Sequence, residues 1–170
     1  MRKFSLFLSV AVRLFASTVL LGCASAAAVG QDEAGVRDVV NRFAENWNKH
    51  DMGAFGSLFT SNADFVQVNG VWWKGREEIQ KNVEFLHGTI PQSSVGVTLP
   101  PSAYGVFRAS IYRFEHIDVR FLTKDVAVAH ILWAQLGDPR FTEPRRGMLS
   151  FVVTSEHDHW LINAAQNTVR

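Results

Sequence analysis

The stretch that most constrains the fold covers residues 117–134, where two apolar runs rich in Val, Ile and Phe flank the polar residues 123–125. This pattern predicts a β-hairpin whose strands are long enough to form the centre of a sheet. His130 lies in the middle of the second run, where most neighbours are aliphatic. We therefore expect the hairpin to supply both a core and one polar group that points into the interior.

The chain before this hairpin begins with the periodicity of helices. Residues 32–50 place five apolar side chains at helical spacing and so predict one buried helix face, formed by Val36, Val39, Val40, Phe43 and Trp47. Asp51 is expected to cap a second, shorter helix that carries Phe55, Leu58 and Phe59.

The periodicity then changes from that of a helix to that of a strand. Residues 63–68 alternate in character and predict a strand with Phe65 and Gln67 on the same side. An Asn-Gly turn at residues 69–70 ends this strand, and residues 71–73 form a short return.

The rest of the chain predicts one more helix, a loop and a series of strands. Residues 76–87 have helical spacing, and the Pro, Gly, Ser and Thr content of residues 88–105 predicts a long loop. Such a loop either covers a site or reaches a partner, or it is a mobile surface excursion. Strands are expected over residues 108–115 with 117–122, and over residues 126–136, 147–154 and 160–167.

These elements predict an α+β domain in which a curved antiparallel sheet packs on three N-terminal helices and makes a cone with a cavity. A length of 170 residues suits one domain with a sizeable core. The chain has thirteen Phe and five Trp, and such a supply of aromatic side chains either fills the core or lines a ligand cavity.

Several motifs resemble a known family. The run WNKHDMGAFGSLFTSNADFVQVNGVWWKGREEI resembles the N-terminal signature of SnoaL-like proteins in the nuclear-transport-factor-2-like superfamily. VRFLTKDVAVAH and WLINAAQNT resemble the SgcJ/EcaC-type branch, and the resemblance covers residues 32–168. It implies the cone-shaped fold and a homodimer formed through the outer sheet face. Members of the superfamily include isomerases, dehydratases, cyclases, epoxide hydrolases and plain binding modules, so the resemblance specifies fold better than activity.

The sequence lacks the catalytic residues that steroid isomerases of this superfamily use. In those members a carboxylate on the first strand takes the proton, and a tyrosine on the first helix holds the oxyanion. Gln67 and Phe43 stand at these places, and Gln67 cannot act as a base while Phe43 cannot donate a hydrogen bond. Members of the branch are often called oxidoreductases, but the sequence has no Gly-rich dinucleotide motif after a strand and no cysteine pair. No cofactor is expected.

The candidate contacts of a small, largely apolar ligand are polar side chains on strands and nearby aromatic rings. An unpaired inward polar group costs about 1–3 kcal/mol, so each needs a partner in protein, water or ligand. The candidate ligand contacts are Gln67, Asn69, Trp73, Trp133, Asn167 and Phe43. Packing is the alternative role of the two Trp residues, and Asn167 has the alternative role of tying the last strand to a turn.

His130 is the candidate catalytic residue. It would serve as general acid or base in a cofactor-free isomerisation, dehydration or hydrolysis, and the alternative is a core histidine satisfied by a neighbour. His157 and His159 lie in a polar turn between two predicted strands, so no metal site is expected there.

Residues 1–28 have the pattern of an export signal, with a basic start, a short apolar run and small residues, and residues 29–170 would form the SnoaL-like domain. Cleavage after the small residues predicts a periplasmic or secreted protein. Residues 20–23 resemble a lipoprotein box, which would instead leave a lipid anchor on Cys23. The apolar run is too short to span a bilayer, so no membrane span is expected.

Charge argues against nucleic acid as a partner. Without Arg2, Lys3 and Arg13, the remaining 14 basic residues face 16 acidic ones, a net charge of −2. The expected partner is a small-molecule ligand. The alternative function is a non-catalytic homodimeric interaction module of the cell envelope, in which side chains fill the pocket and the loop at residues 88–105 contacts a protein.

Overall fold

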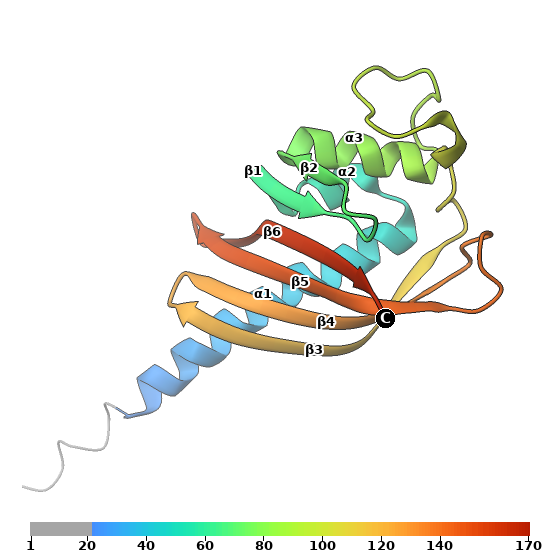
Figure 1. The fold of residues 1–170 in the computed structure, drawn as a ribbon. Helices are drawn as coiled ribbons and strands as arrows, with labels where there is room; N and C mark the ends of the chain where they lie inside the picture. Colours follow the sequence, from blue (N-terminus) through green and yellow to red (C-terminus); the bar gives the residue numbers. More distant parts are fainter. Residues whose placement is uncertain (1–21) are drawn as a thin grey trace, which may run out of the picture.

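The computed structural model describes residues 22–170, with side chains described from residue 33 onward. One curved sheet of six strands, in the order β2-β1-β6-β5-β4-β3, packs against the long helix α1, and α2 and α3 lie toward its β1–β2 end (Figure 1). The elements are α1 (Gly22–Lys49), α2 (Met52–Gly56), β1 (Phe59–Val66), β2 (Trp72–Lys74), α3 (Arg76–His87), a short 3-10 helix (Pro101–Ala103), β3 (Ile111–Thr123), β4 (Val126–Leu136), β5 (Arg145–Glu156) and β6 (His159–Val169). The architecture is α+β, as the sequence predicts.

Helix α1 buries the face that its periodicity predicts. The five predicted residues are each at most 4% exposed: Val36, Val39, Val40, Phe43 and Trp47. The helix begins at Gly22, before the predicted start at residue 32. Most of the predicted export segment, residues 1–21, lies outside the described residues. Within residues 22–170, no helix is long and apolar enough to cross a membrane.

Local signals set the short elements that follow α1. Asp51 Oδ1 accepts a hydrogen bond from the Ala54 amide at 2.9 Å and caps α2, as predicted. Leu58 and Phe59 were expected on this helix, but α2 already ends at Gly56, a poor helix former. Leu58 lies in the turn that follows, and Phe59 is the first residue of β1. Helix α3 has its predicted bounds, and Gly88 ends it in the left-handed region at a φ of 66°.

The predicted hairpin forms, but at the edge of the sheet rather than at its centre. Strands β3 and β4 pair antiparallel, with Ile117 opposite Ile131. Strand β1 pairs parallel with β6, and β2 then extends the sheet beyond β1. This pairing joins segments far apart in the sequence and places β5 and β6 at the centre. The sheet is therefore mixed, whereas the sequence predicts a wholly antiparallel one.

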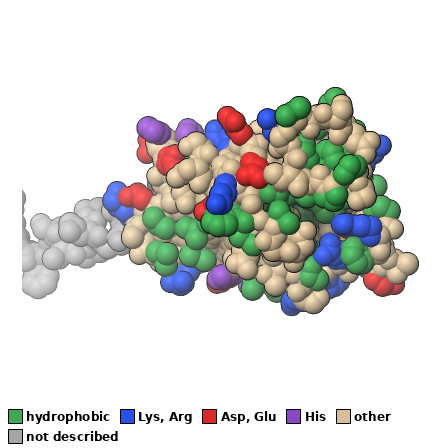
Figure 2. All heavy atoms as spheres, turned by 45° about the horizontal axis from the view of Figure 1, so that its top comes forward, with side chains coloured by type: hydrophobic (Ala, Val, Ile, Leu, Met, Phe, Trp, Pro, Cys, Tyr) green, Lys and Arg blue, Asp and Glu red, His purple; other side chains and the backbone are tan. Residues whose placement is uncertain are grey.

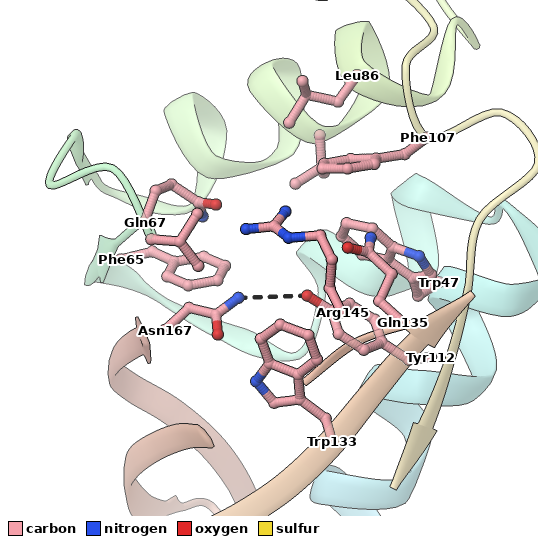
Figure 3. A pocket seen from close by; sticks show the side chains of 12 residues that line it. Trp47, Phe65, Gln67, Leu86, Phe107, Tyr112, Trp133, Gln135, Arg145 and Asn167 are labelled. Atoms are coloured by element: carbon pink, nitrogen blue, oxygen red, sulfur yellow. Dashed lines mark hydrogen bonds between the residues drawn. The ribbon is translucent and has the colours of Figure 1, made fainter. Parts of the chain in front are cut away.

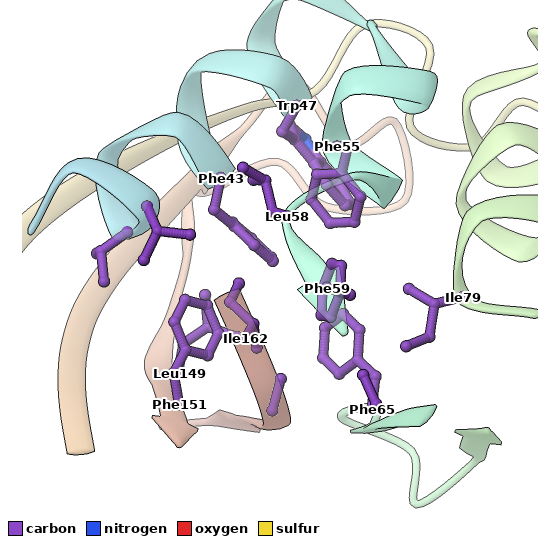
Figure 4. Packing of buried hydrophobic residues seen from close by; sticks show 14 of the residues in the cluster. Phe43, Trp47, Phe55, Leu58, Phe59, Phe65, Ile79, Leu149, Phe151 and Ile162 are labelled. Atoms are coloured by element: carbon purple, nitrogen blue, oxygen red, sulfur yellow. The ribbon is translucent and has the colours of Figure 1, made fainter. Parts of the chain in front are cut away.

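The core fills the space between α1 and the inner face of the sheet (Figure 4). The ring centroid of Phe43 lies 4.6 Å from that of Phe55 and 5.1 Å from that of Phe151. Full burial of side chains of this size stabilises a fold by roughly 1.5–3 kcal/mol each. We call this filled part of the cone, built around Phe43, Phe151 and Ile162, the closed end.

Hydrogen bonds tie down the predicted loop between α3 and β3. Asn82 Oδ1 accepts bonds from the amide and the hydroxyl of Thr98, both at 3.1 Å. Near the end of the loop, the Phe107 amide donates to the Leu86 carbonyl at 2.8 Å. These bonds fix the half-buried ring of Phe107 at the end of the cone opposite the closed end.

Candidate functional site

A pocket opens where the inner faces of β1, β4, β5 and β6 meet α3 and the loop that follows it, and we call this place the mouth (Figure 3). Five aromatic rings line it, namely Trp47, Phe65, Phe107, Tyr112 and Trp133. Four polar side chains lie among these rings, namely Gln67, Gln135, Arg145 and Asn167. The free volume is about 20 Å³, which is room for about one water molecule.

The pleat of three neighbouring strands brings the polar side chains together. Trp133 and Gln135 are two residues apart on β4, so both belong to its inner face. Gln135 pairs in register with Arg145, the first residue of β5. Asn167 lies near the end of β6, opposite Leu149 of β5. The mouth is thus built from adjacent strand ends.

Gly147 allows the Trp133 ring to lie across β5. The two residues are paired in register on adjacent strands. A Cβ atom at position 147 would collide with the Trp133 ring and with the carbonyl oxygen of Thr168. A larger residue would therefore displace the ring that forms one wall of the pocket.

Tyr112 is a neutral hydrogen-bonding group at the mouth. Burial raises the pKa of its phenol to about 12, although the hydrogen bond from Asn167 and the charge of Arg145 act in the opposite direction. Asn167 Nδ2 donates to the Tyr112 hydroxyl at 3.2 Å. The phenol therefore keeps its proton at neutral pH and cannot serve as a general base there.

Three buried polar atoms at the mouth have no hydrogen-bond partner among the described residues. They are Trp133 Nε1, Gln135 Nε2 and Asn167 Oδ1. A buried polar atom without a partner costs about 1–3 kcal/mol. Two donors and one acceptor on residues that line the pocket are therefore without a protein partner.

Arg145 brings a positive charge into this aromatic setting. Its side chain is only 15% exposed, and its guanidinium lies in the middle of the pocket in Figure 3. Asp138 Oδ2 is 3.9 Å from Arg145 Nη1, at the limit of an ion pair. The guanidinium also lies 4.6 Å from the centroid of the Phe141 ring.

The carboxylate of Asp138 binds chiefly to Arg140. Arg140 donates two hydrogen bonds to it, from Nε to Oδ1 at 2.9 Å and from Nη2 to Oδ2 at 2.7 Å. Burial alone would raise the pKa of Asp138, but the hydrogen bonds and charge of Arg140, together with the charge of Arg145, lower it. Asp138 is therefore ionised at neutral pH and already has a close partner.

The structure brings three of the predicted ligand contacts together. Gln67, Trp133 and Asn167 line the pocket. Phe43 lies beneath it in the core, with its ring centroid 6.4 Å from that of Phe65. The other two are elsewhere: Trp73 is buried in the core, and Asn69 lies in the exposed turn, where its side chain accepts a bond from the Val71 amide.

His130 does not point into the cone, and its predicted position is corrected. It is exposed on the outer sheet face, where its Nδ1 lies 3.0 Å from Ser150 Oγ. Ala129, Ile131 and Trp133 occupy the inner face of β4, so period-2 alternation turns residue 130 outward. The sequence contains this signal, because residues 130 and 133 cannot share one face of a regular strand.

Arg145 and Gln135 line the pocket but were not among the predicted site residues. Gln135 could have been found from the alternation that makes Trp133 an inner residue. Arg145 is adjacent to Arg146, and two neighbouring basic residues do not by themselves indicate a site. Only the register between β4 and β5, set across the connection at residues 137–144, shows that Arg145 faces the mouth.

The mouth offers hydrogen bonding, ring contacts and positive charge. The titratable residues that line it are Tyr112 and Arg145, with no carboxylate or imidazole. Across residues 22–170, no group of three or more His, Cys, Asp or Glu side chains could hold a metal ion.

Comparison with solved structures identifies the fold. A domain of unknown function with a cystatin-like fold from Nostoc punctiforme has a TM-score of 0.65 at 24% identity, and the match covers 82% of this chain and 78% of that one. An NTF2-like protein with a cystatin-like fold from Novosphingobium aromaticivorans has a TM-score of 0.68 at 13% identity, over 91% and 92% of the two chains. An uncharacterised protein with a cystatin-like fold from Caulobacter vibrioides has a TM-score of 0.67 at 17% identity, over 82% and 90%.

The chain therefore has the nuclear-transport-factor-2-like, or cystatin-like, fold. No family model matches the sequence, and no curated protein matches it. At these identities the likeness concerns the fold, so function has to be argued from the mouth itself.

Proposed function

We propose that this chain binds a small molecule at the mouth of the cone. The observation that carries the proposal is the set of three buried polar atoms without a protein partner, on Trp133, Gln135 and Asn167. They lie around one pocket whose remaining walls are mostly aromatic and aliphatic. Ligand pockets commonly combine apolar walls with a few convergent polar groups, and a ligand would meet the polar atoms that the protein leaves open.

Binding is favoured over the reaction expected for His130. The imidazole lies on the outer sheet face, so it cannot reach a ligand held inside the cone. The neutral phenol of Tyr112 can donate a hydrogen bond to such a ligand. A cofactor-free isomerisation, dehydration or hydrolysis at the mouth would therefore need its general base from the ligand or from water.

Native mass spectrometry of the protein purified from its own source tests this proposal. The wild type should keep a small molecule, one per subunit, that is absent from the denatured mass. Asn167→Leu should lose this extra mass, because it replaces a polar pocket side chain by an apolar one of the same branched shape. Its matched control is Gln166→Leu, which changes the neighbouring exposed residue of β6 and should keep the extra mass. A wild type without extra mass, or an Asn167→Leu variant that retains it, would contradict the proposal.

A second candidate function is homodimerisation through the outer sheet face. Leu132 and Met148 lie opposite each other on β4 and β5, and Met148 is 37% exposed. Val128 and Val152 form a second apolar pair on the same face. A second copy of this chain is the proposed occupant, because the same face on two copies can pair about a twofold axis.

Light scattering tests this interface. The wild type should have the mass of a dimer, and Met148→Lys should have that of a monomer. Val95→Lys is the control, since Val95 is 89% exposed in the loop after α3 and lies away from the sheet. A monomeric wild type would rule out the dimer.

Export and the SgcJ/EcaC-type branch are also part of the proposal. Export is supported by the composition of residues 1–28, and the branch by the motifs at residues 119–130 and 160–168. The denatured mass of the protein from its own source gives the mature N-terminus. It also distinguishes a periplasmic or secreted product from one that carries lipid on Cys23, and a full-length mass would contradict export.

A further inference from the structure

Resting on the proposed function, we propose that the mouth recognises a carboxylic acid, whose carboxylate pairs with Arg145 while an apolar or aromatic body contacts the surrounding rings. The proposal names a ligand class, an organic anion, where the sequence predicts a largely apolar molecule.

The charges beside the mouth do not balance. Two guanidinium groups, on Arg140 and Arg145, face one carboxylate, on Asp138. Arg140 donates two short hydrogen bonds to that carboxylate, whereas Arg145 lies 3.9 Å from it. One positive charge therefore remains without close compensation, although a largely buried arginine is normally paired.

The guanidinium of Arg145 can donate hydrogen bonds to a ligand. Its side chain is 15% exposed, and within the described residues its ion-pair partner is Asp138 at 3.9 Å and its cation–π partner is the Phe141 ring. A guanidinium presents a planar fork of donors that matches a carboxylate in a two-bond geometry. Figure 3 shows this fork between the side chains of Gln67 and Gln135. Gln135 Nε2 has no protein partner, so it can add a third donor.

The aromatic walls of the pocket suit the rest of the ligand. Phe65, Phe107 and Trp133 line the pocket around the guanidinium, and flat aromatic walls favour a planar or apolar body. The Arg145 side chain lies in the middle of the pocket in Figure 3, and the free volume beside it is about 20 Å³. Entry of the acid therefore requires this long side chain to swing toward solvent and then to close over the carboxylate.

Benzoate and its neutral counterpart benzamide are suitable probes, because they share size and ring and differ in charge. Binding is followed by NMR through the indole N–H signals of tryptophan at constant ionic strength. Trp47 and Trp133 line the pocket and should shift, whereas the exposed Trp72 should not. The wild type should bind benzoate at least about tenfold more tightly than benzamide, as expected for a hydrogen bond to a charged group.

Two variants of Arg145 separate charge from shape. Arg145→Gln should weaken benzoate binding by about tenfold to a hundredfold and leave benzamide binding nearly unchanged. Arg145→Lys keeps the charge but loses the fork, so its loss should be smaller. Arg146→Gln is the matched control, because Arg146 points to the outer face, where it pairs with Glu115, and it should bind as the wild type does. Dispersed indole signals like those of the wild type show that each variant is folded.

Other outcomes overturn the inference in distinguishable ways. Equal binding of benzoate and benzamide, both unaffected by Arg145→Gln, would refute acid recognition and leave small-molecule binding at the mouth in place. Equal weakening by Arg145→Gln and Arg146→Gln would mean that general charge, and not this site, attracts the anion. If neither probe shifts Trp47 or Trp133 at millimolar concentration, acid recognition is wrong, and the mass measurement alone decides whether the mouth holds another class of ligand.

Discussion

The closed end and the mouth of the cone are built on the same strands, yet their inner faces differ in chemistry. On β5, Phe151 is fully buried against Phe43, whereas Arg145 brings a charge into the mouth. On β4, Ile131 lies in the closed end, and Gln135 leaves a buried amide nitrogen without a partner. One part of the sheet therefore packs apolar side chains in the core, while the other part leaves polar groups without a protein partner, which we propose a ligand meets.

The same contrast exists between the two faces of β5. Arg145 points into the pocket, and its neighbour Arg146 pairs with Glu115 on the outside. Figure 2 shows the surface turned toward the viewer, where positive, negative and apolar side chains are interspersed. An exposed ion pair adds little to stability, whereas a partly buried cation acts in a setting of lower dielectric. The position within the pleat, and not the residue type, separates the two arginines.

The largest expected effect lies in the closed end. Phe151→Ala should lower the free energy of unfolding by about 3–5 kcal/mol, because it leaves a cavity among rings that cannot close around it. Val152→Ala is the matched change on the outer face, where the side chain is half-buried, and should cost much less. Urea denaturation measures both losses. Equal losses would mean that the closed end is not the main source of stability.

The second expected effect is a pH dependence at His87, whose ring packs edge-on against Trp47 at a centroid distance of 4.4 Å. Burial, with the charge of His50 as a second cause, lowers the pKa of His87 from 6.5 to about 3. Below about pH 6.5 the unfolded chain therefore binds more protons than the folded one. As the pH is lowered from about 6 to about 3, the free energy of unfolding should fall by about 1.4 kcal/mol per pH unit. Above about pH 7, His87 should not make the free energy of unfolding depend on pH.

Denaturation at a series of pH values checks this slope. His87→Gln should flatten it, because the titrating group is gone. His130→Gln removes an exposed imidazole from the outer face and should leave the slope as it is in the wild type. An unchanged slope in His87→Gln would assign the acid sensitivity to other groups.

The third expected effect concerns the carboxylate of Asp138, which binds Arg140 beside the mouth. Asp138→Asn should destabilise the protein by about 1.5–3 kcal/mol, the usual worth of hydrogen bonds to a charged group. Because the folded pKa of Asp138 is lowered, the wild type has this stabilisation above about pH 4 and loses it as the pH falls through the folded pKa. Asp125→Asn changes a carboxylate whose ion pair with Lys124 is exposed and should cost less than about 1 kcal/mol. Similar losses in the two variants would show that Asp138 does not organise the mouth.

The smallest expected effect on stability is at the mouth itself. Gln135→Leu should change the free energy of unfolding by no more than about 1 kcal/mol, because it removes a buried nitrogen that has no protein partner. The same variant should weaken ligand binding. Denaturation and the benzoate titration measure the two properties separately. A loss of stability comparable to that of Phe151→Ala would mean that Gln135 is structural.

Local signals made much of the fold predictable. The helix periodicity of α1, the Asp51 cap and the bounds of α3 depend on neighbours in the sequence, and all three are confirmed. The order of the strands is not local. The parallel pairing of β1 with β6 joins segments about a hundred residues apart, and this pairing moved the predicted hairpin from the centre of the sheet to its edge.

The candidate site was predictable only in part. Gln67 was found because alternation along residues 63–68 places it on the same side as Phe65, and Trp133 was found as an aromatic candidate. The same rule, applied to β4, would have excluded His130 and included Gln135. Arg145 depends on how residues 137–144 set the register of β5 against β4, and the sequence of that connection does not specify it.

A crystal structure of the protein with benzoate would test the central claim most directly. The account predicts the carboxylate in two bonds of about 2.7–2.9 Å to the guanidinium of Arg145, with the ring against Trp133 or Phe107. Benzoate bound elsewhere, or bound in the mouth with its carboxylate turned away from Arg145, would contradict the account.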